Sequence, residues 1–258
     1  MILIEKFTGL PLKKKLLLLF FLALTLRFAS YFTHPYIHSD SVTYLSINYH
    51  DVNGDIQTGL DLHRQLPPAI LYYMRIFSSL GINVETGYRV TTIFLYSFAL
   101  LSFFYICRFF LSEKAALFAS FCYACHPKLI GYSHSILRES ISIPFMVFGL
   151  SLLLMAFEKN RKNIAAVAGV FITISYMARL EYGVAFIIGL FLFLLAVVLK
   201  LVGERKDLKK YLSHSSMIFL TMIPLLLIVN IEMKSYGSFW DPFAYRKVKG
   251  FVMRTFGE

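Results

Sequence analysis

The sequence has 258 residues, of which 57% are hydrophobic and 16% charged, and its mean hydropathy is +0.64. Because about a quarter of the residues in a soluble domain are charged, this composition excludes a water-soluble globular fold and predicts a membrane protein. The formal net charge of +11 does not indicate nucleic-acid binding, since Lys and Arg occur mostly in short runs between apolar stretches, as in the cytoplasmic loops of membrane proteins.

Apolar segments, taken in chain order, predict about seven membrane crossings. The first, 16–33, follows a run of lysines and lacks a small-residue cleavage site, so we expect a signal anchor that stays in the protein. The other crossings are predicted at 87–110, 115–126, 136–157, 164–178, 183–201 and 215–232. The sequence therefore predicts an all-α, polytopic transmembrane bundle of about seven helices that forms one domain over residues 1–258.

Residues 34–86 form the one long hydrophilic stretch of the sequence and are predicted to be the first outer loop. Pro67 and Pro68 come directly before the run AILYYMRIFSSLG, and proline is favoured at the first position of a helix. We therefore expect this loop to carry short amphipathic helices that lie in the plane of the membrane interface.

Every second loop is basic, and this pattern sets the expected orientation. The residues are Lys13–Lys15, Arg108, Lys114, Lys159, Arg161, Lys162, Arg205, Lys206, Lys209 and Lys210. The positive-inside rule places these loops and the N-terminus in the cytoplasm. The outer face then holds 34–86, the short loop near 127–137, the turn at 179–182 and a tail at 233–258. We expect a multi-pass protein of the cell membrane whose active site faces the periplasm or the exterior.

Ionisable residues gather at the outer ends of the predicted crossings. They are Asp40 after the first crossing, Arg89 at the start of the second, Arg138 and Glu139 at the start of the fourth, and Arg179 after the fifth. Arginine binds phosphate through paired donors and keeps its charge when it is partly desolvated. A carboxylate beside such arginines stays ionised and can accept a proton from an attacking hydroxyl. The set predicts a transferase that acts on a phosphate-bearing substrate, most simply a lipid.

Structural roles for the same residues remain open at this stage. The pairs Arg138-Glu139 and Arg179/Glu181 could be ion pairs that fix the register of their helices. Asp40 could be an ordinary helix cap in a loop. The location of all these residues at one membrane depth favours the functional interpretation over separate structural ones.

The sequence predicts neither a metal ion nor a cofactor. Its histidines on the outer side lack the spacing of HExxH, and the first loop holds no acidic DxD pair. Cys122 and Cys125 have the spacing of CxxC, but they lie in an apolar segment where small residues at a helix contact explain them.

Several short motifs, taken in order, resemble the GT-C glycosyltransferases. They are Asp40 with Tyr44, Arg64 with Pro67-Pro68, Arg89, YSHSILRES at 132–140, YMARLEYG at 176–183 and NIEMKSYGSF at 230–239. The sequence is most similar to the membrane relatives of protein O-mannosyltransferases and lipid A aminoarabinose transferases, over about residues 10–240. Members usually continue well past the seventh crossing, so we expect a short or C-terminally truncated representative.

The resemblance implies an enzyme that moves a sugar from a polyprenyl-phosphate carrier to an acceptor on the non-cytoplasmic face, with inversion at the anomeric carbon. The acceptor could be a protein, a lipid or a glycan. Asp40 matches the acid that acts as catalytic base in such enzymes. The expected substrate-binding residues are Arg89, Arg138, Glu139, Arg179, Arg64 and Tyr44, and of these Arg138 and Arg179 are assigned mainly from charge and position.

Two other functions compete with this interpretation. A binding or transport protein for a lipid-linked sugar would also place arginines near phosphate, but a transporter is expected to show repeats and polar residues near mid-membrane. The sequence shows neither clearly apart from Arg27, which we expect to snorkel to the interface or to pair within the bundle. A purely structural membrane subunit is the third possibility.

Overall fold

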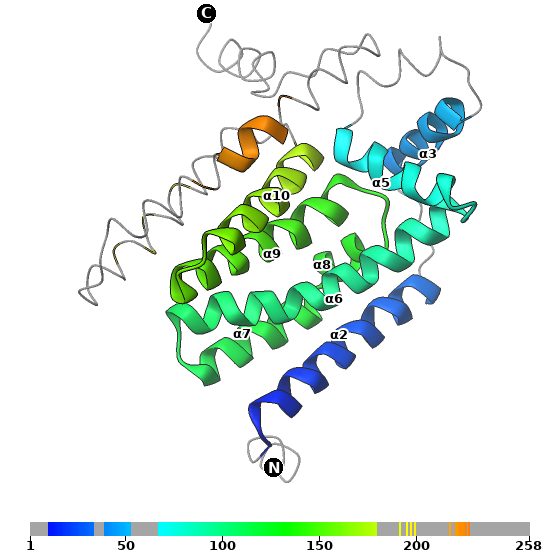
Figure 1. Ribbon diagram of the computed structural model, residues 1–258. Coiled ribbons are helices and arrows are strands. Elements are labelled where there is room, and N and C mark those ends of the chain that lie inside the picture. The colour runs from blue at the N-terminus through cyan, green and yellow to red at the C-terminus, as the bar shows by residue number, and fades with distance from the viewer. Residues whose placement is uncertain are drawn as a thin grey trace, which may run out of the picture.

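A computed structural model describes residues 10–33, 39–52 and 67–179, together with scattered helical positions between 191 and 227. In these parts of the chain the secondary structure is helical, with no strand (Figure 1), which confirms the all-α class. Most of the predicted crossings at 183–201 and 215–232, the tail at 233–258 and Arg64 lie outside the described residues.

Five helices correspond to the first five predicted crossings. They are α2 (Leu12–Thr33), α6 (Val84–Phe110), α7 (Glu113–Cys125), α9 (Arg138–Lys159) and α10 (Lys162–Ala178). By length and composition α2, α6 and α9 can cross a membrane, and α10 is a shorter apolar helix. The chain is a multi-pass membrane protein, and the number of seven crossings stays a prediction.

Helices α2 and α6 run in opposite directions along the bundle. The Phe20 ring lies 5.0 Å from the Phe98 ring, and the Phe28 ring lies 5.8 Å from the Phe94 ring. Residue numbers therefore rise along α2 in the direction in which they fall along α6, as expected for two successive membrane crossings. Ser112 begins the next helix by accepting a hydrogen bond from the Ala115 amide. The Phe103 ring of α6 lies 5.0 Å from the Tyr123 ring near the end of α7, so α7 turns back along α6.

Helices α9 and α10 form the tightest pair in the described bundle. Asn160 takes a left-handed conformation with φ of 54° at the end of α9, which lets the chain turn back within a few residues. A methyl group added at Gly149 would lie 2.5 Å from Cγ1 of Ile172 and 3.2 Å from the Ala168 carbonyl oxygen. The absence of a side chain at this glycine is therefore what brings the two helices together.

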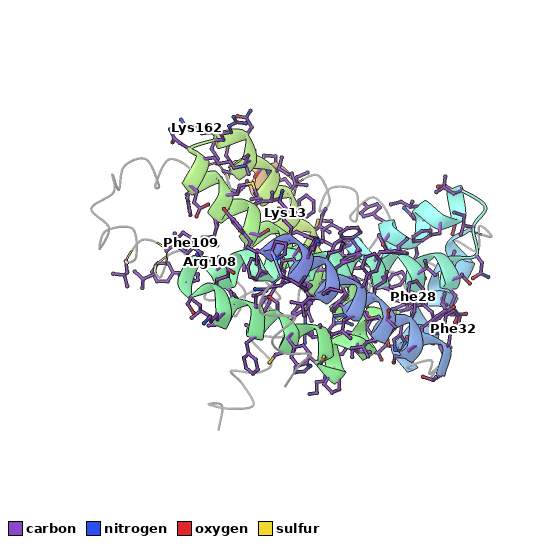
Figure 2. All side chains as sticks on the ribbon, turned by 90° about the horizontal axis from the view of Figure 1, so that it is seen from below. Lys13, Phe28, Phe32, Arg108, Phe109 and Lys162 are labelled. Carbon is purple, nitrogen blue, oxygen red and sulfur yellow. The ribbon has the colours of Figure 1, made fainter. Side chains whose placement is uncertain are left out.

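The alternating directions bring the predicted outer ends of the helices together at one end of the bundle. The basic residues Arg108 and Lys162 lie toward the opposite end from Phe28 and Phe32 (Figure 2). At that basic end the Tyr105 hydroxyl of α6 donates a hydrogen bond to the Glu158 carboxylate of α9. The two faces predicted from the loop charges are thus two separate ends of the molecule.

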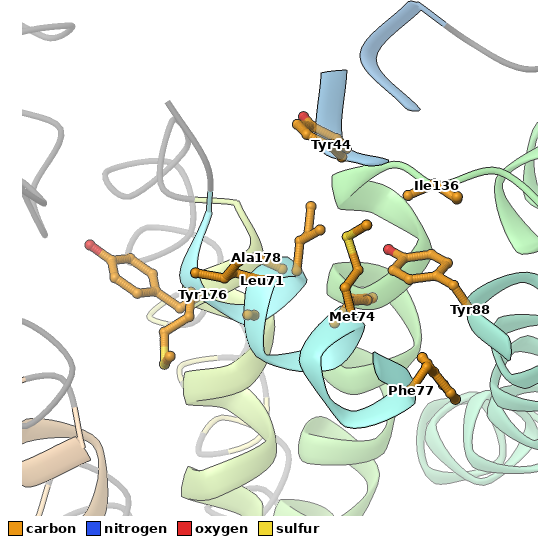
Figure 3. Close-up of a cluster of buried hydrophobic side chains, with 12 residues drawn as sticks. Tyr44, Leu71, Met74, Phe77, Tyr88, Ile136, Tyr176 and Ala178 are labelled. Carbon is orange, nitrogen blue, oxygen red and sulfur yellow. The ribbon is translucent and has the colours of Figure 1, made fainter. Parts of the chain in front are cut away.

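Two short helices, α3 (Ser39–Val52) and α5 (Pro68–Ser79), lie at the other end, beside the start of α6 (Figure 1). Helix α5 begins at the Pro67-Pro68 pair, as predicted, and ends before Gly81, whose φ is +66°. Its apolar side is turned to protein, because Ile70 and Met74 are fully buried. This buried side belongs to a cluster that also includes Tyr44, Tyr88, Ile136 and Tyr176 (Figure 3).

We expect Gly149→Val to destabilise the protein, because its side chain would collide with the Ile172 side chain and crowd the backbone of α10. Overpacking of this kind costs about 1–3 kcal/mol, which lowers the thermal midpoint by roughly 2–10 °C for a chain of this size. The matched control is Gly131→Val in α8 (Pro127–Ser133), where nothing lies within 4 Å of the added carbon. Equal midpoints for the two variants in detergent would contradict the packing described for α9 and α10.

Candidate active site at the start of α9

Hydroxyl groups from two other helices fix the segment that leads into α9. The Ile136 carbonyl accepts a hydrogen bond from Ser41 of α3 at 3.1 Å, and the Leu137 carbonyl accepts one from Tyr88 of α6 at 3.0 Å. Immediately after it, the Glu139 carbonyl accepts one from Tyr96 of α6 at 2.6 Å. These bonds fix the direction in which the side chains of residues 138 and 139 leave the backbone.

Arg138 connects the start of α9 to α3. Its Nε donates a hydrogen bond of 2.8 Å to the hydroxyl oxygen of Tyr44, a buried side chain. Burial raises the pKa of the Tyr44 phenol, an effect that the hydrogen bond from Arg138 opposes, so the phenol keeps its proton at neutral pH. A phenol that accepts through its oxygen can still donate this proton to a ligand.

Asp40 lies in the first turn of α3, one turn before Tyr44, and its side chain is exposed. Because Ser41 and Tyr44 both bond to the segment 136–138, α3 holds Asp40 at the same end of the bundle as Arg138. A carboxylate in the first turn of a helix is also favoured by the helix dipole. Asp40 therefore lies at the end of a helix, as considered from the sequence, and is also accessible to a substrate.

Glu139 pairs with Arg179, which lies 40 positions later in the sequence. Nη2 of Arg179 lies 3.2 Å from Oε1 of Glu139, and both side chains are partly exposed. Arg179 directly follows α10, where a cation is favoured by the helix C-terminus. The ion pair considered for this region thus joins the ends of two helices, whereas Glu181 lies outside the described residues.

Arg89 occupies a separate position, between α6 and α2. Its side chain is only 2% exposed, and its Nη2 lies 2.8 Å from Oε1 of Glu85 one turn earlier. The guanidinium carbon also lies 6.0 Å from the centre of the Tyr31 ring of α2. The structure therefore gathers Asp40, Tyr44, Arg138, Glu139 and Arg179 around the start of α9, and it places Arg89 at the neighbouring contact with α2.

The hydroxyls of Ser41, Tyr88 and Tyr96 were not predicted to support this site. A signal for two of them is present in the sequence, because Tyr88, Thr92 and Tyr96 are spaced by four residues and so share one face of an otherwise apolar helix. All three are buried. Over the described ranges, no three His, Cys, Asp or Glu side chains form a group that could hold a metal ion.

The fold is a helical membrane bundle. Acidic and basic side chains gather at one of its ends, where they can bind a charged substrate. A family model described as dolichyl-phosphate-mannose-protein mannosyltransferase matches residues 65–228, and the chain belongs to this family. The protein is thus a GT-C type membrane glycosyltransferase that uses a lipid-linked sugar donor, as the motifs predicted. Searches of curated proteins and of solved structures returned no match.

The matched residues divide the candidate site into two parts. Arg89, Arg138, Glu139 and Arg179 lie within the match, whereas Asp40 and its helix α3 come before its first residue. The connection between the two parts is therefore carried by contacts in the structure, namely those that Ser41 and Tyr44 make with the start of α9.

We expect Tyr44→Phe to weaken donor binding, because Arg138 loses the acceptor that orients it. The lost hydrogen bond is worth about 0.5–1.5 kcal/mol, which corresponds to a KM for the donor that is roughly 2- to 12-fold higher. Steady-state transfer with purified protein in nanodiscs measures this change. Tyr105→Phe is the matched control, since it removes a hydroxyl of the same kind at the basic end. A similar rise in KM for both variants would contradict a specific role of Tyr44.

Proposed function

We propose that the protein transfers a sugar from a polyprenyl-phosphate carrier to an acceptor on the non-cytoplasmic face, with inversion, and that Asp40 is the general base. The observation that carries this proposal is the docking of α3 on the start of α9. It places an exposed carboxylate at the same end of the bundle as Arg138 and the Glu139–Arg179 pair.

The chemistry of such a transfer needs one base and positive charge for the leaving group. The acceptor oxygen attacks the anomeric carbon, and the bond from that carbon to the phosphate oxygen breaks. The acceptor proton passes to the Asp40 carboxylate, and the phosphate leaves as the monoester of the carrier. A single displacement of this kind inverts the anomeric carbon. A second carboxylic acid is not required, because phosphate is a good leaving group, unlike the alkoxide released from an ordinary glycoside.

The arginines supply the positive charge. Arg138 is oriented by Tyr44 through its Nε, and a guanidinium held in this way can bind phosphate oxygens through its terminal nitrogens. Arg179 is positioned by Glu139, and its partial exposure allows contact with a headgroup at the surface. Arg89 is more deeply buried, so its role is to support the contact of α6 with α2 and to add positive potential to the site.

The orientation follows from the loop charges. Arg108, Lys114, Lys159, Arg161 and Lys162 flank the helix ends opposite to α3 and α5, and the positive-inside rule assigns that end to the cytoplasm. The N-terminus before α2 is then cytoplasmic, and the site at the start of α9 faces the periplasm or the exterior of a cell membrane. The acceptor at this face is a lipid, a glycan or a protein.

We expect Asp40→Asn to lower kcat by at least about 100-fold, because the amide keeps the size of the carboxylate but cannot accept the acceptor proton. The assay follows radiolabelled sugar from a polyprenyl-phosphate-sugar pool in membranes that contain equal amounts of each variant. Glu113→Gln is the matched control, since it makes the same change in the first turn of α7 at the basic end.

Two results would count against the proposal in different ways. Full transfer by Asp40→Asn would remove Asp40 as the base while leaving the enzyme class intact. Binding of the lipid-linked sugar by the wild type without transfer to any acceptor fraction would instead support the binding or transport protein considered from the sequence.

A further inference from the structure

Arg27 is buried inside the bundle, so of the two alternatives expected for it, snorkelling to the interface is wrong, and its contacts are made within the bundle. Arg27 lies well within α2, and its side chain is 0% exposed. Nη1 donates hydrogen bonds to the Ala23 carbonyl at 2.9 Å and to the Ala124 carbonyl of α7 at 3.4 Å. The other two nitrogens, Nε and Nη2, are buried and have no hydrogen-bond partner among the described residues.

Two tyrosines flank this guanidinium. Its carbon lies 5.8 Å from the ring centre of Tyr96 in α6 and 5.8 Å from that of Tyr123 in α7. The Tyr96 hydroxyl is already bonded to the Glu139 carbonyl, whereas the Tyr123 hydroxyl is buried and has no hydrogen-bond partner in the described part of the chain. Three polar atoms around one position, two guanidinium nitrogens and one hydroxyl oxygen, thus lack a hydrogen-bond partner among the described residues.

The charge of Arg27 is also uncompensated by the residues that the structure describes. Arg89 pairs with Glu85 and Arg179 pairs with Glu139, whereas no carboxylate of the described residues pairs with Arg27. Burying an ion without an opposite charge costs several kcal/mol, and the two tyrosine rings and two carbonyls around Arg27 leave two of its nitrogens without a hydrogen bond. The site is therefore suited to an anion with several acceptor oxygens, which a guanidinium binds through paired N–H groups.

We propose that Arg27 and Tyr123 form a buried subsite, between α2, α6 and α7, for the phosphate monoester of the polyprenyl carrier after the sugar has left. The inference rests on the proposed function. The monoester carries about −1.5 to −2 charges at neutral pH and three acceptor oxygens, which can be shared between the guanidinium and the phenol. Arg27 lies about 9 Å from the end of α2 that is nearest the candidate active site, by the rise of a helix.

Tyr96 connects this subsite to the site at the start of α9. Its ring lies against the Arg27 guanidinium, and its hydroxyl holds the Glu139 carbonyl. A phosphate that binds Arg27 therefore lies next to the residue that positions the first turn of α9. The spent carrier would be held below the position of sugar transfer, which makes it a competitor of the next donor molecule.

The experiment measures the binding of a short-chain polyprenyl phosphate, without sugar, to the full chain in nanodiscs. We expect Tyr123→Phe to weaken this binding about 5- to 10-fold and to leave the thermal midpoint unchanged or higher, because the hydroxyl it removes has no partner among the described residues. Arg27→Gln is expected to weaken it further. Tyr105→Phe, which alters the basic end, is expected to bind like the wild type.

Two further arms separate the possible sources of phosphate. Phosphatidylglycerol and inorganic phosphate are titrated against the same variants, and we expect neither to depend on Tyr123. Unchanged polyprenyl phosphate binding in Tyr123→Phe would overturn the subsite. An equal loss for phosphatidylglycerol would overturn its assignment to the carrier. Asp40→Asn is expected to bind polyprenyl phosphate normally while its kcat falls at least about 100-fold, so failure of the proposed function and failure of this subsite give different results.

Discussion

The hydrogen bonds to the carbonyls of Ile136, Leu137 and Glu139 are the constraint on which the candidate site depends. A carbonyl oxygen has two lone pairs, and that of Leu137 also accepts the Ser140 amide at the start of its own helix. The hydroxyls of α3 and α6 therefore add further hydrogen bonds that join this segment to both helices. The same bonds attach the polar helix α3 to the bundle, and so bring Asp40 to the end where Arg138 and Glu139 begin α9.

Alternating helix directions make this arrangement possible. Helix α9 starts, and α10 ends, at the same end of the bundle, because the turn at Asn160 reverses the chain, and Gly149 lets the two helices pack closely. Arg179 can therefore reach Glu139 from a distant point in the sequence. Deeper in the bundle, the packing of α2 against α6 and α7 encloses Arg27 with two tyrosines. Glu139 and Arg179 pair with each other near the surface, whereas the buried charge of Arg27 has no carboxylate partner among the described residues and can bind a ligand.

The sequence predicted those features that depend on local patterns. Runs of apolar residues indicated the positions of five helices, Pro67-Pro68 indicated the start of α5, and loop charges separated the two ends. Contacts between distant segments were beyond such patterns. The partner of Glu139 depends on how α9 packs on α10, and the burial of Arg27 depends on which helices surround α2. From the sequence alone, Tyr96 in an apolar helix resembles a ring that faces lipid. Only the structure shows that its hydroxyl donates a hydrogen bond to the Glu139 carbonyl.

The central claim is that the sugar is transferred at the start of α9, and the most direct measurement is to map where the donor sugar binds. A polyprenyl-phosphate-sugar that carries a photoreactive group on the sugar would be crosslinked to the full chain in nanodiscs, and the labelled peptides identified by mass spectrometry. We expect labels in α3 and in the first turn of α9. Labels confined to the turns between α6 and α7 and between α9 and α10 would contradict it.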